Sequence, residues 1–264
     1  MAAAQAESVP GDVAANVATA VTLVTAAADQ GARVVVLPEL FLTGYDPDTW
    51  AHDTSLALDD PVLDPVSEVA AGRSVVVVAG AAVRRALDES TVSAVVFAAD
   101  GCVRATYDKQ HLSGPEWELF TPGTGGMTIV VDGWDFGLGI CNDGSFPAHV
   151  TAAAADGAAA YLCPAAYYSG AEHRRDLRFA ARALDNGIYV VVSGLSGTCG
   201  VGVFSGGSAV YDPEGRPLGR AGGESSAVVV ADLDTAEVSV AQAVSPGTSE
   251  RVGPLGPRTR LELS

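Results

Sequence analysis

A cysteine stands at the end of an apolar segment, where its thiol could act as a nucleophile. The stretch 136–140 predicts a buried strand that ends at Cys141, and the turn-forming cluster 142–145 precedes an alanine-rich, helix-forming segment. This order would place the thiol beside backbone N–H groups at a helix N-terminus, a setting that lowers a thiol pKa from about 8.5. A free cysteine that only packs in the core is the alternative, and this segment alone does not decide between them.

Glu39 and Lys109 supply the groups that a cysteine nucleophile needs, and both also follow predicted strands. Glu39 lies just past the continuous apolar run 34–37, and Lys109 ends the strand predicted over 103–108. A free thiol is only a few per cent thiolate at about pH 7, so it needs a base, which a carboxylate could provide. The ammonium could then stabilise a tetrahedral oxyanion. Solvated side chains at strand ends are the alternative for both residues.

Other motifs give weaker indications of a site. The Gly-rich stretch 197–207 lacks the Lys-Ser/Thr pair and the helix of a phosphate loop, so we interpret it as a loop between strands. A Ser–His–Asp triad is an alternative, but the sequence contains no Gly-x-Ser-x-Gly elbow that would support it. We predict no metal and no cofactor, because ligand spacing is absent among the four histidines, His52, His111, His149 and His173. A solvated or interface helix face is our interpretation of four arginines at helical spacing, Arg174, Arg175, Arg178 and Arg182.

The elements that must position these residues indicate one α/β domain over residues 1–264, with a tail from about residue 243. Helical patterns occupy 13–30, a weaker stretch at 64–71, a segment ending near 156, and 172–186. Strands are predicted at 2–5, 34–37, 75–82, 91–98, 103–108, 136–140, 159–163, 188–193, 208–212 and 227–233. A loop is expected around 116–118. Successive strands interrupt a simple Rossmann order, so we expect a two-sheet sandwich flanked by helices.

The composition limits the classes of partner and the cellular compartment that we expect for this chain. Hydrophobic residues make up 48% of the 264 residues and aromatic residues only 6%, which suits an α/β protein packed with small side chains. The net charge of −17 argues against nucleic acid as a partner, since phosphate binding needs clustered Lys and Arg. No apolar run reaches the length of a membrane span and residues 1–30 lack a signal-peptide pattern, so we expect a cytoplasmic protein without membrane contact.

Three blocks around the candidate residues resemble the signature blocks of the carbon–nitrogen hydrolase (nitrilase) superfamily: 35–45, 107–112 and 139–147. The resemblance extends from residues 4–5 to 208–215. It implies an αββα sandwich, which forms four layers and usually dimerises, so we expect a homodimer or a higher homo-oligomer. The Glu–Lys–Cys triad of the family maps onto Glu39, Lys109 and Cys141.

The branch of the family follows from the residues after the cysteine. True nitrilases typically have Cys-Trp-Glu, whereas this chain has Cys-Asn-Asp and resembles the amidase or carbamoylase side. The resemblance implies hydrolysis of a non-peptide C–N bond in a small linear amide or N-carbamoyl compound. The reaction would proceed through a cysteine thioester and release ammonia or an amine. Nitrile hydrolysis to the acid, and a non-catalytic binding or scaffold role, are the alternatives.

The resemblance also implies supporting residues. A second glutamate fits Glu116, with Glu118 as the other candidate, and would orient the substrate and Lys109. The backbone N–H of Asn142 would join Lys109 at the oxyanion. Candidate pocket walls, for which core packing is the alternative, are Tyr45, Trp117, Tyr167 and Tyr168. The chain departs from the family at Asn142, and at Ala148 and Thr151, where the family often has Glu and Arg; these departures bear on the substrate.

Overall fold

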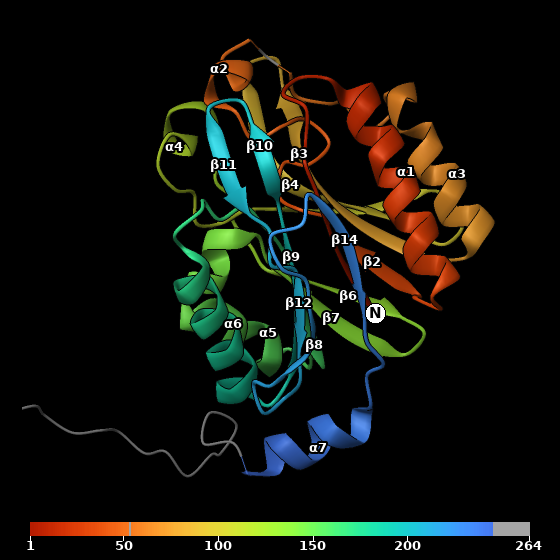
Figure 1. Cartoon of the computed structure of the whole chain (residues 1–264), viewed down its shortest axis with the longest axis vertical. Coiled ribbons are helices and arrows are strands. Elements are labelled where there is room, and N and C mark those ends of the chain that lie inside the picture. Colours follow the sequence, from red (N-terminus) through yellow and green to blue (C-terminus); the bar gives the residue numbers. More distant parts are fainter. Residues whose placement is uncertain (53, 245–264) are drawn as a thin grey trace, which may run out of the picture.

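Two six-stranded sheets form the centre of the molecule (Figure 1). The computed structural model describes residues 1–52 and 54–244. The first sheet, in the order β14-β1-β2-β3-β4-β5, contains β1 (Ala2–Ala6), β2 (Val34–Val36), β3 (Val76–Ala86), β4 (Glu89–Phe97), β5 (Val103–Asp108) and β14 (Ser226–Val230). The second, in the order β13-β12-β9-β8-β7-β6, contains β6 (Met127–Val131), β7 (Trp134–Leu138), β8 (Ala160–Ala165), β9 (Tyr189–Gly194), β12 (Ala209–Tyr211) and β13 (Pro217–Arg220).

The central strands are parallel and the outer strands antiparallel in both sheets. β1, β2 and β3 pair in parallel in the first sheet, as do β7, β8 and β9 in the second. The two sheets pack against each other through these strands, with β1 against β9 and β2 against β8. The central strands are therefore buried on both faces, which explains their continuous Val- and Ala-rich runs.

Two pairs of helices cover the outer faces of the sheets (Figure 1). The helices α1 (Val13–Asp29) and α3 (Asp64–Arg73) pack on the first sheet, and α5 (Pro147–Ala155) and α6 (Glu172–Asn186) on the second. The Asp12 carboxylate caps α1 by accepting from the Ala15 N–H, and Gly187 ends α6 with a left-handed φ of 60°. The layers run helix, sheet, sheet, helix, so the predicted single-domain αββα sandwich is confirmed.

Short elements correct two sequence-based expectations. The segment expected as a loop around 116–118 is a short helix, α4 (Glu116–Leu119). The Gly-rich stretch expected as a loop is a hairpin of β10 (Ser196–Cys199) and β11 (Gly202–Ser205). The helix α7 (Thr235–Val244) ends near the predicted start of the tail at about residue 243, and the tail itself lies in residues 245–264, outside the described residues. The remaining elements are α2 (Pro47–Trp50), η1 (Pro61–Leu63) and η2 (Cys141–Ser145).

Candidate active site

Glu39 lies in the turn that follows β2, and its side chain is fully buried. The backbone bends sharply here, because Leu40 has a φ of 51°. Gly80 of β3 contacts this turn: a Cβ on Gly80 would lie 2.3 Å from the Pro38 carbonyl oxygen and 2.6 Å from the Glu39 Cα. Only glycine fits at that approach, so Gly80 helps to fix where the Glu39 carboxylate points.

Lys109 follows β5 and is the single lysine among the 264 residues of the chain. Its side chain is fully buried, and Nζ donates to Glu39 Oε1 at 2.6 Å and to Glu116 Oε1 and Oε2 at 2.8 and 2.7 Å. Burial alone would lower the pKa of this ammonium. The charges of Glu39 and Glu116 outweigh burial and hold the Lys109 pKa well above its ordinary value, so the side chain is a fixed cation.

Glu116, rather than Glu118, is the second glutamate beside Lys109. Glu116 begins α4 and is fully buried, whereas Glu118 is exposed on the same short helix. The Ser113 N–H donates to Glu116 Oε2 at 2.9 Å and the Tyr45 hydroxyl to Oε1 at 2.9 Å. These bonds, together with the Lys109 ammonium, hold the Glu116 carboxylate in one orientation.

Cys141 begins η2, directly after the segment that extends β7. Its backbone has a left-handed φ of 42°, which is rare for a residue other than glycine and costs on the order of 1–3 kcal/mol. The thiol is largely buried and donates a weak hydrogen bond to the Ala166 carbonyl oxygen at 3.7 Å. The Glu39 carboxyl also lies near the thiol, close enough for its charge to raise the Cys141 pKa. The structure therefore brings the predicted base, cation and thiol into one buried cluster.

The predicted lowering of the Cys141 pKa is wrong. Burial raises the pKa of the thiol well above its ordinary value, the Glu39 charge raises it further, and Lys109 only partly opposes this. The expected helix N-terminus is not at the thiol either, because η2 intervenes and α5 begins only at Pro147. The resting thiol is consequently neutral, and its proton must be taken up when it reacts.

Burial also raises the pKa of the Glu39 carboxyl, to about 7. The neighbouring Lys109 charge opposes this shift, and Glu116 adds to it. At neutral pH the carboxyl is therefore present in both protonation states, as suits a group that accepts and returns a proton. The catalytic roles of Glu39, Lys109 and Cys141 stay predictions at this point.

The supporting residues predicted from the sequence differ in how deeply they are buried and in what they contact. The Asn142 side chain donates to the carbonyl oxygens of His111 and Leu112 at 3.1 and 3.4 Å. Tyr45 is buried against Glu116. Burial raises the pKa of Tyr167, and a charge on the nearby Cys141 would raise it further. Tyr168 is 49% exposed, and Trp117 is 60% exposed on α4, so Trp117 contributes least to the buried cluster.

Two aromatic residues near the site, Trp50 and Phe204, were not predicted from the sequence. Trp50 and Phe204 pack edge-on against Tyr45, with ring centroids 5.0 and 5.3 Å away, and Tyr168 stacks on Phe204 at 4.9 Å. Phe204 belongs to β11, in the stretch that was expected to be a loop. An aromatic residue between glycines was the available signal, because a hairpin can present such a ring to a neighbouring segment.

The four arginines of α6 do not share the solvated or interface face that the sequence predicted, because Arg174 is exposed whereas Arg175 and Arg182 are buried. Arg175 is 1% and Arg182 9% exposed. The Arg175 guanidinium donates to the Gly206 carbonyl oxygen at 2.6 Å, and Arg182 donates to the Gly144 carbonyl oxygen at 3.1 Å. Arg178 donates to the Ser145 hydroxyl at 2.7 Å. This helix face therefore holds the turn after Cys141 and the end of β11.

Comparison with known proteins agrees with this fold. The amidase from Nesterenkonia sp., solved as a variant in which a cysteine is replaced by alanine, superposes with a TM-score of 0.82 at 30% identity, covering 90% of this chain and 92% of that chain. A nitrilase from Pyrococcus abyssi is 32% identical, covering 83% of each chain. The chloroplastic omega-amidase of Arabidopsis thaliana is 28% identical, covering 94% of this chain and 71% of its own length. The carbon-nitrogen hydrolase profile matches residues 1–243, so the chain belongs to the carbon–nitrogen hydrolase family.

Proposed function

We propose that this protein hydrolyses the C–N bond of a small linear amide or N-carbamoyl compound through a thioester on Cys141, releasing ammonia or an amine. One observation carries the proposal: the fully buried Lys109 ammonium lies between the carboxylates of Glu39 and Glu116, next to the Cys141 thiol. Burying a cation and two carboxylates is expensive in free energy, so their presence in a fold otherwise packed with Val and Ala favours a chemical role.

In the acylation step, Glu39 accepts the proton of the Cys141 thiol as sulfur attacks the substrate carbonyl carbon. The tetrahedral oxyanion is stabilised by the Lys109 ammonium and the backbone N–H of Asn142. Glu39 then gives its proton to the departing nitrogen, so the C–N bond breaks, ammonia or an amine leaves, and the thioester remains. A carboxyl group with a pKa of about 7 can both accept and donate this proton near neutral pH.

In the deacylation step, Glu39 takes a proton from water, which attacks the thioester carbonyl. The C–S bond breaks, the carboxylic acid leaves, and the Cys141 sulfur recovers the proton from Glu39. Glu116 holds the Lys109 ammonium through both of its carboxylate oxygens, and in this proposal it also orients the substrate. In this proposal Tyr45, Tyr167, Tyr168 and Trp117 are the walls of the substrate pocket, and Trp117 is the most exposed of the four.

The nature of the substrate is supported by relatives. Variants of the Nesterenkonia amidase have been solved with acrylamide and with butyramide, and one carries the acetamide moiety of fluoroacetamide covalently on its active-site cysteine. Omega-amidases of Arabidopsis and mouse are also among the relatives. The ligands of the Nesterenkonia amidase are small amides, and the two other relatives are named as amidases. We therefore propose a small linear amide or N-carbamoyl compound as the substrate of this chain.

Nitrile hydrolysis is the second candidate, because the relative from Pyrococcus abyssi at 32% identity is named a nitrilase. A panel of short ω-amides, N-carbamoyl acids and aliphatic nitriles, assayed for released ammonia, separates the two. We expect release from an amide or carbamoyl compound, and none from the Cys141→Ala variant. Release from nitriles alone would favour the second candidate. If no compound reacts and iodoacetamide labels Cys141 no faster than the other cysteines, a non-catalytic scaffold role replaces both.

We also propose a cytoplasmic homodimer or higher homo-oligomer, on the basis of the family resemblance. Within residues 1–52 and 54–244, no helix has the length and apolar character needed to cross a bilayer. Light scattering of the purified protein tests the oligomeric state, and an observed mass equal to that of one 26.7 kDa chain would contradict it.

A further inference from the structure

Asp143 is a fully buried carboxylate in the same short turn as Cys141. Its Oδ1 accepts from the backbone N–H of His111 at 2.9 Å and from His111 Nδ1 at 2.8 Å. Its Oδ2 accepts from the Tyr107 hydroxyl at 2.7 Å and from the backbone N–H of Ile140 at 3.0 Å. A carboxylate offers about four lone-pair sites, so these four donors satisfy it completely.

One of these bonds closes the turn that contains Cys141. The Ile140 N–H donates to the Asp143 side chain, while the Asp143 N–H donates to the Ile140 carbonyl oxygen at 2.9 Å. Cys141 lies between these residues in its left-handed conformation. The paired bonds across Cys141 oppose relaxation of that conformation, and so hold the direction in which the thiol points.

The other bonds hold the chain on both sides of Lys109. Tyr107 and His111 stand two residues before and two residues after it. One carboxylate therefore connects the turn of the thiol to the segment of the ammonium. The Asn142 side chain adds a second connection, through its bonds to the backbone carbonyl oxygens of His111 and Leu112.

His149 of α5 extends the network away from the thiol. The Tyr107 hydroxyl donates to Asp143, so it accepts from His149 Nε2–H at 2.8 Å, and the Tyr161 hydroxyl donates to His149 Nδ1 at 3.0 Å. This pattern assigns the Nε2–H tautomer to a neutral His149. Burial lowers the pKa of His149, which is consistent with a neutral ring.

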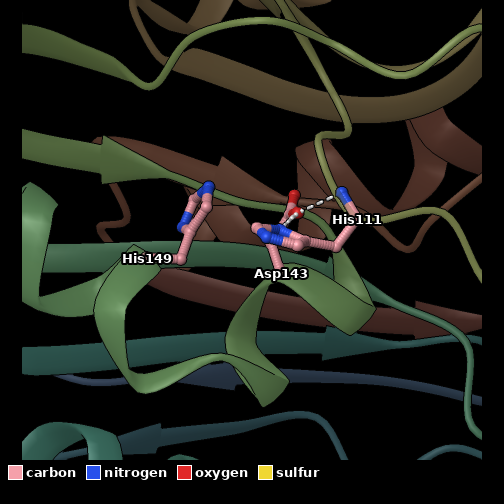
Figure 2. Close-up of side chains that lie close together, drawn as sticks. All are labelled: His111, Asp143 and His149. Atoms are coloured by element: carbon pink, nitrogen blue, oxygen red, sulfur yellow. Dashed lines mark hydrogen bonds and ion pairs between the residues drawn. The ribbon is translucent and has the colours of Figure 1, made fainter.

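The same side chains also have the composition of a metal site. Figure 2 shows His111, Asp143 and His149 side by side, and their ligand atoms all lie within 4.8 Å of one another. A cation would have to displace the donors that satisfy Asp143 and the hydroxyls that face both ring nitrogens of His149. Protein groups thus already fill the positions that a metal would need, which favours a hydrogen-bond network over a metal site.

We propose that Asp143 is a positioning residue, which fixes the Cys141 turn relative to Lys109, and that Tyr107 and His149 hold Asp143 in place. The proposal rests on the roles proposed above for Cys141 and Lys109. Asp143 touches none of the reacting atoms, so its removal should act on the chemical step more than on substrate binding.

Asp143→Asn tests this with almost no change in size. Each carboxylate oxygen accepts a backbone N–H, from His111 or from Ile140, and these donors cannot reverse. In either orientation, an asparagine NH2 therefore faces one backbone N–H and leaves it unpaired. A displacement of about 1 Å can lower a rate about 100-fold, so we expect kcat to fall about 100-fold with KM changed less than about threefold. The rate at which iodoacetamide alkylates Cys141 should also differ from that of the unmodified protein, because the Cys141 turn is displaced.

Tyr107→Phe is the second variant, because it removes one donor to Asp143 and leaves the backbone N–H groups paired. The loss of one hydrogen bond should lower kcat about tenfold, and the effects of the two changes should not add when they are combined. Asp156→Asn is the matched control, because this carboxylate is exposed and accepts from the Thr128 hydroxyl, and the variant should retain kcat.

Circular dichroism checks that each variant is folded. If Asp143→Asn does not fold, the kcat of Tyr107→Phe alone tests the proposal. The proposal is overturned if a folded variant keeps kcat within about twofold of the unmodified protein, or if KM rises while kcat is unchanged. Full activity of Asp143→Asn, with turnover still lost in Cys141→Ala, would remove the positioning role and leave the proposed function standing.

Discussion

The Lys109 ammonium lies 2.6 Å from Glu39 Oε1, and both side chains are fully buried. Glu116 places a second carboxylate 2.7 Å from the same ammonium. With Glu39 ionised, two carboxylates face one ammonium and the cluster carries one excess negative charge. With Glu39 protonated, the cluster is neutral. Burial therefore favours the protonated form and raises the Glu39 pKa to about 7, which connects the charge balance of the cluster to the pH dependence of the reaction.

The rate should follow the ionisation of Glu39. Because Glu39 must be ionised to accept the thiol proton, kcat/KM should rise with pH and level off above about 7. Well below that pH it should fall about tenfold per unit. Ammonia release from about pH 5 to about pH 9 measures this profile, with the exposed Glu118→Gln variant as control. A rate that stays constant from about pH 5 to about pH 8 would remove Glu39 as the base.

Glu39→Gln should abolish turnover and make the fold more stable at alkaline pH. The folded-state pKa of Glu39 is raised, so the protonated carboxyl favours folding below the unfolded pKa of about 4.3, and this contribution is lost as pH rises through about 7. Its loss amounts to about 4 kcal/mol. Glutamine stays neutral, so urea unfolding should show a gain over the unmodified protein at about pH 8 that shrinks by about pH 5. The same gain at both pH values would contradict the assigned shift.

Lys109 should resist amine reagents while the protein is folded. Its side chain is fully buried and paired with two carboxylates, and the chain has no other lysine. An N-hydroxysuccinimide ester should therefore label only the N-terminal amine of the folded protein, and should label Lys109 once urea unfolds it. Peptide mapping by mass spectrometry identifies both positions. Labelling of Lys109 in the folded protein as fast as labelling of the N-terminus would show that the cluster is open to solvent.

Gly80→Ala should impair catalysis by displacing the Glu39 turn, while every side chain of the cluster keeps its identity. The new methyl group would meet the Pro38 carbonyl oxygen at 2.3 Å and displace the turn that carries Glu39. We expect a loss of about 1–3 kcal/mol in the free energy of unfolding and a lower kcat. Gly72→Ala is the control, because nothing lies within 4 Å of its added methyl group in α3. Equal stability and kcat in the two variants would argue that the Glu39 turn is not held by this contact.

The apolar runs of strands buried on both faces predicted a two-sheet sandwich flanked by helices, and polar residues directly after such runs stood out. The family resemblance implied the αββα order of the layers and the triad of Glu39, Lys109 and Cys141. The Cys141 pKa was predicted in the wrong direction, because burial outweighs the neighbouring N–H groups and the sequence does not reveal how completely the thiol is enclosed. Hidden burial also explains why the sequence wrongly predicted an exposed position for Arg175 and Arg182. Both donate to buried backbone carbonyl oxygens, and no sequence pattern identifies such acceptors.

The Asp143 network could not be predicted from spacing. His111 and His149 stand 38 residues apart, and they are joined by the Asp143 carboxylate and the Tyr107 hydroxyl. The β10–β11 hairpin was missed because glycines usually indicate a loop, whereas here they flank a paired strand that carries Phe204. Both features depend on tertiary contacts, which local patterns do not encode.

Covalent capture of the acyl intermediate tests the central claim most directly. The protein is mixed with a short amide that it turns over, quenched in acid, and examined by intact mass and peptide mapping, beside Cys141→Ala and Cys163→Ala. We predict an acyl adduct on Cys141, turnover in Cys141→Ala below about one thousandth of the unmodified rate, and continued turnover in Cys163→Ala. An adduct on Cys163, or turnover in Cys141→Ala above that level, would contradict the assignment of Cys141 as the nucleophile.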